Sequence, residues 1–285
     1  MSHTKLDTIT DQINSESYDL IDAMNYSGLK EFLISPAHYK HSIDTEDDSD
    51  NPAFKIGRAL HMAVFQPLVF ANLWSVAPEC DRRTTAGKTI WNDFLAHNLG
   101  KEVLSSSEYE LVCSMSEKVK ANKFFKDNVT SLNFNECGVF TNLWGSNVKG
   151  RLDTYDPINN VIFDLKSIKV PPTAKAMRHE IFARGYHLQS ALYKEMVYSI
   201  TKKMPKFIFG FIEKNKPFSL NFATIGQTYH HSACIQIQTA LCRYENCKSE
   251  NKWFGFDNEF EPLVISPDYE LDGGIEVEDN SHLDD

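Results

Sequence analysis

The chain has 285 residues, 42% of them hydrophobic, and a formal net charge of −10. This length suits one large domain or two small ones, and the hydrophobic fraction is enough for a sizeable packed core. No run of about eighteen apolar residues occurs, which excludes a membrane-spanning helix. The polar N-terminus argues against a signal peptide, and the six scattered cysteines are typical of reduced thiols. We therefore expect a cytoplasmic protein.

The acidic residues are unevenly distributed. They concentrate in residues 44–50 and in the tail from Asp268 to Asp285, two segments that are poor in aromatic residues and are predicted to be disordered or solvated. Without them the middle of the chain is near neutral, with local basic clusters. The net charge does not favour binding to DNA, whose phosphates attract Lys and Arg, but its distribution does not exclude it.

The N-terminal half is predicted to be helical. Residues 1–20 are expected to be a loose lead-in. Apolar residues recur at helical spacing from Tyr26 to Tyr39, with Ser27 as a candidate N-cap and Ser35-Pro36 as a break. The remaining predictions in this half are a helix over 52–65 that Pro67 ends, an exposed basic loop over 78–88, and helices over about 86–98 and 105–121.

The second half changes to short segments rich in aromatic and β-branched residues. Turn-forming residues separate three such segments, which predicts a three-stranded meander. The predicted strands are 136–144, 148–155 and 160–167, followed by helices 173–183 and 187–202, strands 206–213 and 217–224, and a helix over 227–248. We interpret residues 21–265 as one α/β domain with a mixed central sheet, flanking helices and a helical N-terminal elaboration, followed by an acidic tail over 266–285.

Three charged residues on neighbouring predicted strands are candidate catalytic residues. Asp153 lies on one strand and Asp164 on the next, and Lys166 shares a strand face with Asp164. The segment around Asp164 and Lys166 is strongly apolar, so this charged pair is hard to explain as surface decoration. Two carboxylates could hold Mg²⁺ through hard oxygen ligands, and a lysine could orient water or stabilise the transition state of phosphodiester hydrolysis.

These residues carry a family resemblance. The pattern resembles that of the PD-(D/E)XK nucleases of the RecB type, which have a restriction-endonuclease-like fold. It consists of Asp153, then Asp164-Leu165-Lys166, and then Gln189 and Tyr193 on the following helix. More narrowly, five blocks in the same order resemble the RecE-like exonucleases (exodeoxyribonuclease VIII) of phages and prophages. These blocks are Ser35-Pro36-Ala37-His38-Tyr39, Gly57-Arg58-Ala59-Leu60-His61, Arg82-Arg83-Thr84-Thr85-Ala86-Gly87-Lys88, Lys149-Gly150-Arg151-Leu152-Asp153 and Tyr186-His187-Leu188-Gln189.

The resemblance implies roles for named positions. Asp153, Asp164 and the backbone carbonyl of Leu165 would bind the metal, and His61 would be a further ligand or would organise the metal site. Apart from the resemblance, the position of Glu136 by the first predicted strand would let it join the metal shell or anchor a basic group. Gly57 would allow close packing one turn before His61. Lys166 would be the catalytic lysine, and Gln189 and Tyr193 would address the DNA and the scissile phosphate. The candidate DNA-binding residues are Arg82, Arg83, Lys88, Arg151, Arg178 and Arg184.

Other cofactors have little support in the sequence. Cys242 and Cys247 lack the second pair that an iron–sulfur cluster or zinc site would need. Gly87-Lys88-Thr89 lacks the upstream glycine of a nucleotide-binding loop. We expect Mg²⁺, with Mn²⁺ as a possible substitute, and neither ATP nor an iron–sulfur cluster.

The sequence thus predicts a Mg²⁺-dependent exodeoxyribonuclease. By resemblance it would act 5′→3′ on the ends of linear double-stranded DNA, leave 3′ tails for annealing-type recombination in a bacterial host cell, form a homo-oligomeric ring and work with a single-strand annealing protein. Two alternatives stay open: an endonuclease or single-strand nuclease of the same superfamily in repair or defence, and a non-catalytic DNA-end-binding protein.

Overall fold

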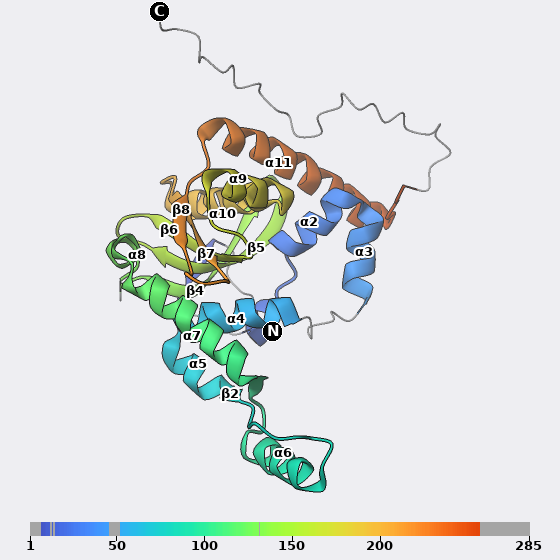
Figure 1. Ribbon diagram of the computed structural model, residues 1–285. Helices are drawn as coiled ribbons and strands as arrows, with labels where there is room; N and C mark the ends of the chain where they lie inside the picture. Colours follow the sequence, from blue (N-terminus) through green and yellow to red (C-terminus); the bar gives the residue numbers. More distant parts are fainter. Residues whose placement is uncertain (1–6, 12, 14, 46–51, 131, 257–285) are drawn as a thin grey trace, which may run out of the picture.

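The structure is a computed structural model that describes residues 7–11, 13, 15–45, 52–130 and 132–256. Its centre is a six-stranded sheet in the order β1-β4-β5-β6-β7-β8 (Figure 1). The strands are β1 (Thr8–Thr10), β4 (Phe134–Leu143), β5 (Ser146–Asp156), β6 (Val161–Ile168), β7 (Lys206–Glu213) and β8 (Leu220–Ala223). β6 and β7 are parallel and the other pairs are antiparallel. The predicted mixed sheet is confirmed.

Local sequence explains the meander. β4 and β5 join through the two-residue turn Trp144-Gly145, in which both residues have positive φ, as a tight hairpin with right-handed strand twist requires. After β5, the Asp156 carboxylate accepts hydrogen bonds from the backbone N–H groups of Ile158 and Asn159 and shapes the turn into β6.

Helices cover both faces of the sheet. One face packs against α2 (Tyr26–Ile34), α10 (Tyr186–Thr201) and α11 (Gln227–Glu250), with a core that includes Phe32, Leu192 and Leu241. The other face packs against α4 (Pro52–Phe65), α7 (Ser106–Ala121) and α8 (Lys123–Asn128). α9 (Ala174–Ala183) and α10 make the crossover between the parallel strands β6 and β7. α3 (Pro36–Asp44) follows α2.

A projection extends from the α4 side of the body. It comprises α5 (Pro67–Leu73), β2 (Trp74–Val76), α6 (Thr85–His97) and β3 (Glu102–Leu104), with β2 and β3 paired in parallel. Figure 1 shows α6 at the outer end of this projection, away from the sheet. We call residues 78–101 the α6 arm.

Several boundary predictions are wrong. The expected loose lead-in contains β1, which pairs with β4, and α1 (Ser15–Asp19), whose Tyr18 packs on Phe140. The short strands β2 and β3 and the helix α8 were not predicted, because three to six residues carry too little periodicity. The α2 N-cap is Asn25, whose side chain accepts a hydrogen bond from the Gly28 N–H, and not Ser27. The predicted acidic tail, residues 266–285, lies outside the described residues.

Ser35-Pro36 separates two helices as predicted: α2 ends at Ile34, and Ser35 caps α3 by accepting a hydrogen bond from the His38 N–H. All six cysteines are free thiols. Within the described part of the chain, no helix combines the length and apolarity needed to cross a membrane.

Candidate active site

The candidate site lies where β5 and β6 separate. The two strands pair only from Asp156↔Val161 to Thr154↔Phe163. At the next residue, Asp153, the carboxylate replaces the missing backbone partner, because its Oδ2 accepts a hydrogen bond of 2.7 Å from the Leu165 N–H. The gap beside β5 is filled by Met24, whose backbone hydrogen-bonds to Asn147 and Lys149 at 2.9 Å. The Asp153 carboxylate and Met24 therefore satisfy backbone groups of Leu165, Asn147 and Lys149 that the β5–β6 pairing leaves without a partner.

His61 on α4 reaches this split from the opposite layer. Its Nε2 lies 2.7 Å from the Leu165 carbonyl oxygen, and its Nδ1 lies 3.2 Å from Asp153 Oδ1. Both partners are acceptors, so the surroundings of the ring favour an imidazolium, in which both nitrogens carry a proton. Burial lowers the pKa of His61, but the charge and hydrogen bond of Asp153, aided by the charge of Glu136, outweigh this and raise it to about 9.

Asp164 and Lys166 form a buried ion pair. They project to the same side of β6, with 2.8 Å between Lys166 Nζ and Asp164 Oδ1, and the Asp164 side chain is 2% exposed. Burial raises the pKa of Asp164 to about 6 against the opposing charge of Lys166. The Tyr186 ring of α10 lies over the ammonium, 4.6 Å from Nζ to the ring centroid. The lysine is thus held between a carboxylate and an aromatic ring.

Glu136 completes the acidic group. It lies on β4 between Asn135 and Cys137, whose partners on β5 are Thr154 and Leu152, and so faces Asp153. Its φ is +48°, a left-handed conformation that is uncommon for a residue other than glycine and that strains the strand. Burial and the Asp153 charge raise the pKa of Glu136 to about 7. A strained backbone that holds a carboxylate beside another carboxylate is typical of a functional site.

Three of these groups, His61, Glu136 and Asp153, form the floor of a cleft of about 1110 Å³. Their ligand atoms lie within 4.8 Å of one another. Asp164 and Lys166, on the neighbouring strand β6, are not among the residues that line the cleft. The polar and aromatic side chains around the cleft include Tyr18, Tyr26, Arg58, Arg151 and Tyr193. Arg151 contacts Glu136, with 3.5 Å between Arg151 Nε and Glu136 Oε2.

The α10 helix closes one side of the cleft. Tyr193 is buried and lies against Gly150: a Cβ at Gly150 would be 2.9 Å from the Tyr193 ring, so β5 needs glycine here. Gln189, one turn earlier, is also buried, and its side-chain oxygen has no hydrogen-bond partner among the described residues. A buried amide oxygen without a partner is suited to an ordered water or a ligand.

The other predicted residues lie in different surroundings. Arg82, Arg83 and Lys88 are exposed on the α6 arm, where the Arg82 guanidinium lies 4.3 Å from the centroid of the Trp91 ring. Arg178 is exposed on α9, and Arg184, just after α9, pairs with Glu180. The structure therefore brings His61, Glu136, Arg151, Asp153, Asp164, Leu165 and Lys166 together with Gln189 and Tyr193, and separates the arm from them.

The explanation expected for Gly57 is wrong within this chain. A Cβ there would meet no atom of the described residues within 4 Å, so none of these residues packs closely against it. Lys149 of the Lys149–Asp153 block is structural: its ammonium donates to the carbonyl oxygens of Tyr18, at 2.9 Å, and Ile21, at 2.8 Å.

Sequence reasoning gave no site role to Tyr26 or Tyr186. The Tyr26 hydroxyl lines the cleft and donates to the Arg184 carbonyl oxygen at 3.1 Å. Tyr186 is the first residue of a block that carries the family resemblance, and that position was the available signal.

The donor set fits a divalent cation. Three carboxylates, an imidazole and a backbone carbonyl offer the oxygen and nitrogen atoms that Mg²⁺ and Mn²⁺ bind. Burial, and after it the charge of Asp153, raise the pKa values of Glu136 and Asp164, and a bound cation would favour the charged forms of both carboxylates. The residues that would hold the ion are His61, Asp153, Asp164, the Leu165 carbonyl and Glu136.

Comparisons with known proteins agree with this geometry. The model of a PDDEXK-like domain of unknown function (DUF3799) matches residues 25–255. A crystal structure of a "putative exonuclease" from Eubacterium rectale is similar with a TM-score of 0.62 and 16% sequence identity, over 90% of this chain and 96% of that one. At this identity the likeness shows the fold. No curated protein matches the chain. Because the family model covers most of its length, the chain belongs to this PDDEXK-like family, as its ordered motifs predicted.

Proposed function

We propose that the protein is a Mg²⁺-dependent exodeoxyribonuclease that degrades linear double-stranded DNA in the 5′→3′ direction. The observation that carries the proposal is the convergence of His61, Glu136, Asp153, Asp164 and Lys166 where β5 and β6 separate. The fold and family membership support a nuclease, and the name of the Eubacterium rectale protein supports an exonuclease.

The metal would supply two things when bound: a water of lowered pKa and positive charge against the developing negative charge on phosphate. Asp153 is pre-positioned for binding because the Leu165 N–H fixes one of its oxygens. His61 must release a proton to become a ligand, and the Leu165 carbonyl and Asp153 already orient its ring.

Lys166 would stabilise the negative charge that develops on the phosphate during the reaction. Its ammonium is held by Asp164 and by the Tyr186 ring, so its position is fixed before substrate arrives. A pre-positioned cation stabilises the charge that develops on a phosphate at little reorganisation cost. Tyr193 lines the cleft on the α10 side, and Gln189 lies one turn earlier on the same helix; both would contact the DNA strand.

The pathway and assembly are part of the proposal and rest on the family resemblance. The product would be duplex with 3′ single-stranded tails for annealing-type recombination, and the active form would be a homo-oligomeric ring that encloses DNA and works with a single-strand annealing protein. A ring would need basic residues only along its channel, which is compatible with a net charge of −10. Molar mass measured by light scattering with and without a DNA duplex tests the ring.

The activity is tested with linear duplex DNA labelled at the 5′ or 3′ end, incubated with Mg²⁺ or with EDTA. We expect early, Mg²⁺-dependent release of the 5′ label and no attack on a covalently closed circle. Lys166→Ala should be inactive, whereas Lys169→Ala, an exposed lysine just after β6, should match the wild type. Cutting of the circle would establish an endonuclease instead, and DNA binding without any cutting would overturn the catalytic assignment.

A further inference from the structure

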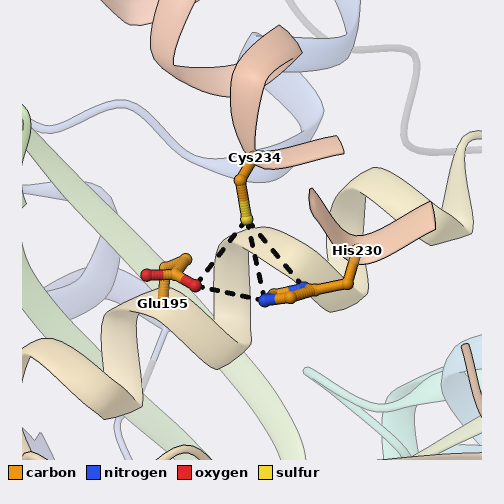
Figure 2. Close-up of side chains that lie close together, drawn as sticks. All are labelled: Glu195, His230 and Cys234. Carbon is orange, nitrogen blue, oxygen red and sulfur yellow. Dashed lines mark hydrogen bonds and ion pairs between the residues drawn. The ribbon is translucent and has the colours of Figure 1, made fainter. Parts of the chain in front are cut away.

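A second cluster of metal-ligating side chains lies between α10 and α11. Glu195 projects from α10, and His230 and Cys234 project from α11 (Figure 2). The ligand atoms of the three residues lie within 4.8 Å of one another. His230 and Cys234 are four residues apart on a helix, so they share one face. The Glu195 and His230 side chains are 18% and 16% exposed, which leaves a side of the cluster open to solvent.

The spacing of the three ligand atoms matches a tetrahedral metal. His230 Nε2 lies 3.2 Å from Glu195 Oε1, and Cys234 Sγ lies 3.7 Å from each of these atoms. Zinc bonds of about 2.1 Å to nitrogen and oxygen and about 2.3 Å to sulfur, at tetrahedral angles, separate nitrogen and oxygen by about 3.4 Å and sulfur from either by about 3.6 Å. These three separations differ from the tetrahedral values by about 0.2 Å or less. Cys234 Sγ also lies 3.9 Å from His230 Nδ1, so the imidazole ring has to turn for its Nε2 lone pair to face the shared ion.

The chemistry of the ligands selects the ion. A thiolate is a soft ligand that Mg²⁺ and Ca²⁺ avoid and that Zn²⁺ binds strongly. A thiolate, a carboxylate and a neutral imidazole carry two negative charges, which one Zn²⁺ balances. We propose that Glu195, His230 and Cys234 form a Zn²⁺ site with a fourth position open to water.

The proposed zinc site would link α10, which lines the cleft, to α11, which packs against α10. Glu195 lies two residues after Tyr193, on the helix that closes the cleft, and α11 packs against that helix through buried residues that include Ala233 and Ile237. A metal ion bound to ligands from both helices would therefore stabilise the position of α11 against α10. This proposal does not depend on the proposed nuclease activity, because none of its ligands belongs to the cleft.

Cobalt provides a test specific for sulfur. Co²⁺ bound to a thiolate gives a ligand-to-metal charge-transfer band in the near ultraviolet, and the cleft ligands His61, Glu136, Asp153 and Asp164 contain no sulfur. We expect the metal-free full-length protein to develop this band with one equivalent of Co²⁺ and to lose it when Zn²⁺ is added. No band at excess Co²⁺ would overturn the site.

Two pairs of variants assign the band to these residues. Cys234→Ser should abolish it and His230→Ala should weaken cobalt binding at least tenfold. The matched controls are Cys242→Ser and His231→Ala, because both residues are exposed on the same helix, and both controls should keep the band. A band that survives Cys234→Ser, or unchanged cobalt affinity in His230→Ala, would refute the assignment.

Thermal unfolding gives a second readout and checks folding. Metal-free Cys234→Ser should melt cooperatively, close to the metal-free wild type, because serine keeps the size of the side chain. Zinc at about a hundredfold excess over its Kd should raise the wild-type Tm by roughly 5–10 °C, and this shift should be absent in Cys234→Ser. An equal zinc-induced shift in both proteins would place the stabilising zinc elsewhere and contradict the proposal.

Discussion

The floor of the cleft and the α6 arm both carry charged residues that the sequence singled out, but their surroundings differ. Asp153 on the floor and Asp164 on the neighbouring strand are largely buried and are bonded to a backbone N–H, an imidazole or an ammonium. On the arm, Arg83 and Lys88 are exposed, and Arg82 stacks on Trp91. Burying a charge costs several kcal/mol unless it is well paired, whereas an exposed charge costs almost nothing. A buried charged cluster therefore says more about function than an exposed one.

The largest effect is expected from neutralising the cleft floor. Asp153→Asn should lower the Mg²⁺-dependent rate at least about a hundredfold, because it removes a negative charge from the metal-binding group and the charge that pairs with His61. Initial rates of nucleotide release at saturating DNA measure the decrease. The matched control is Asp93→Asn on α6, an exposed carboxylate of the arm whose neutralisation should leave the rate within about twofold. Similar decreases in both variants would remove the distinction between the two regions.

Two glycines, Gly150 and Gly57, differ in whether a neighbouring side chain leaves room for a Cβ atom. Gly150→Ala places a Cβ 2.9 Å from the Tyr193 ring and should destabilise the fold by about 1–3 kcal/mol. Gly57→Ala on α4 meets no neighbour and should stabilise it by about 0.5–1 kcal/mol through helix propensity. Urea unfolding measures both. Equal destabilisation would mean that Gly57 is packed after all. An inactive but stable Gly57→Ala protein would instead indicate that a bound substrate needs the space.

Substitutions of Glu136 test whether the backbone strain at this residue is retained because its carboxylate is needed for activity. Glu136→Gly should raise the free energy of unfolding by about 1 kcal/mol, because glycine adopts a φ of +48° without strain and like-charge repulsion with Asp153 disappears. The same variant should lose Mg²⁺-dependent activity. Glu136→Gln keeps a side chain on the strained backbone, so it should lose activity with a smaller gain in stability. A Glu136→Gly protein with full activity would exclude Glu136 from the metal-binding group.

The smallest effect is expected from the arm. Replacing Arg82, Arg83 and Lys88 together by Ala should weaken DNA binding several-fold at low salt and leave the rate at saturating DNA unchanged, since these residues lie away from the cleft. The dependence of log affinity on log salt concentration should flatten by about 0.9 for each DNA phosphate that the variant no longer neutralises. An unchanged salt dependence would show that the arm does not bind DNA. A hundredfold decrease in the rate at saturating DNA would show that it reaches the active site.

Much of the fold followed from local patterns. The β4–β5–β6 meander, the break at Ser35-Pro36 and the long helices agree with the prediction, because each has a strong period or a turn-forming residue at its end. The segments that failed depend on partners far away in the sequence. β1 is a strand because Ile9 pairs with Val139, and nothing within Thr8–Thr10 signals that pairing.

By itself the sequence determined that Asp153, Asp164 and Lys166 lie close together, because they stand on adjacent strands at a spacing that brings them together. Only the tertiary structure decided how they are held. It places His61 between the Leu165 carbonyl and Asp153, turns Glu136 toward Asp153 at positive φ, and places Glu195 beside His230 and Cys234. The reason is physical: strand spacing is fixed by the backbone, whereas contacts between layers depend on how whole helices pack.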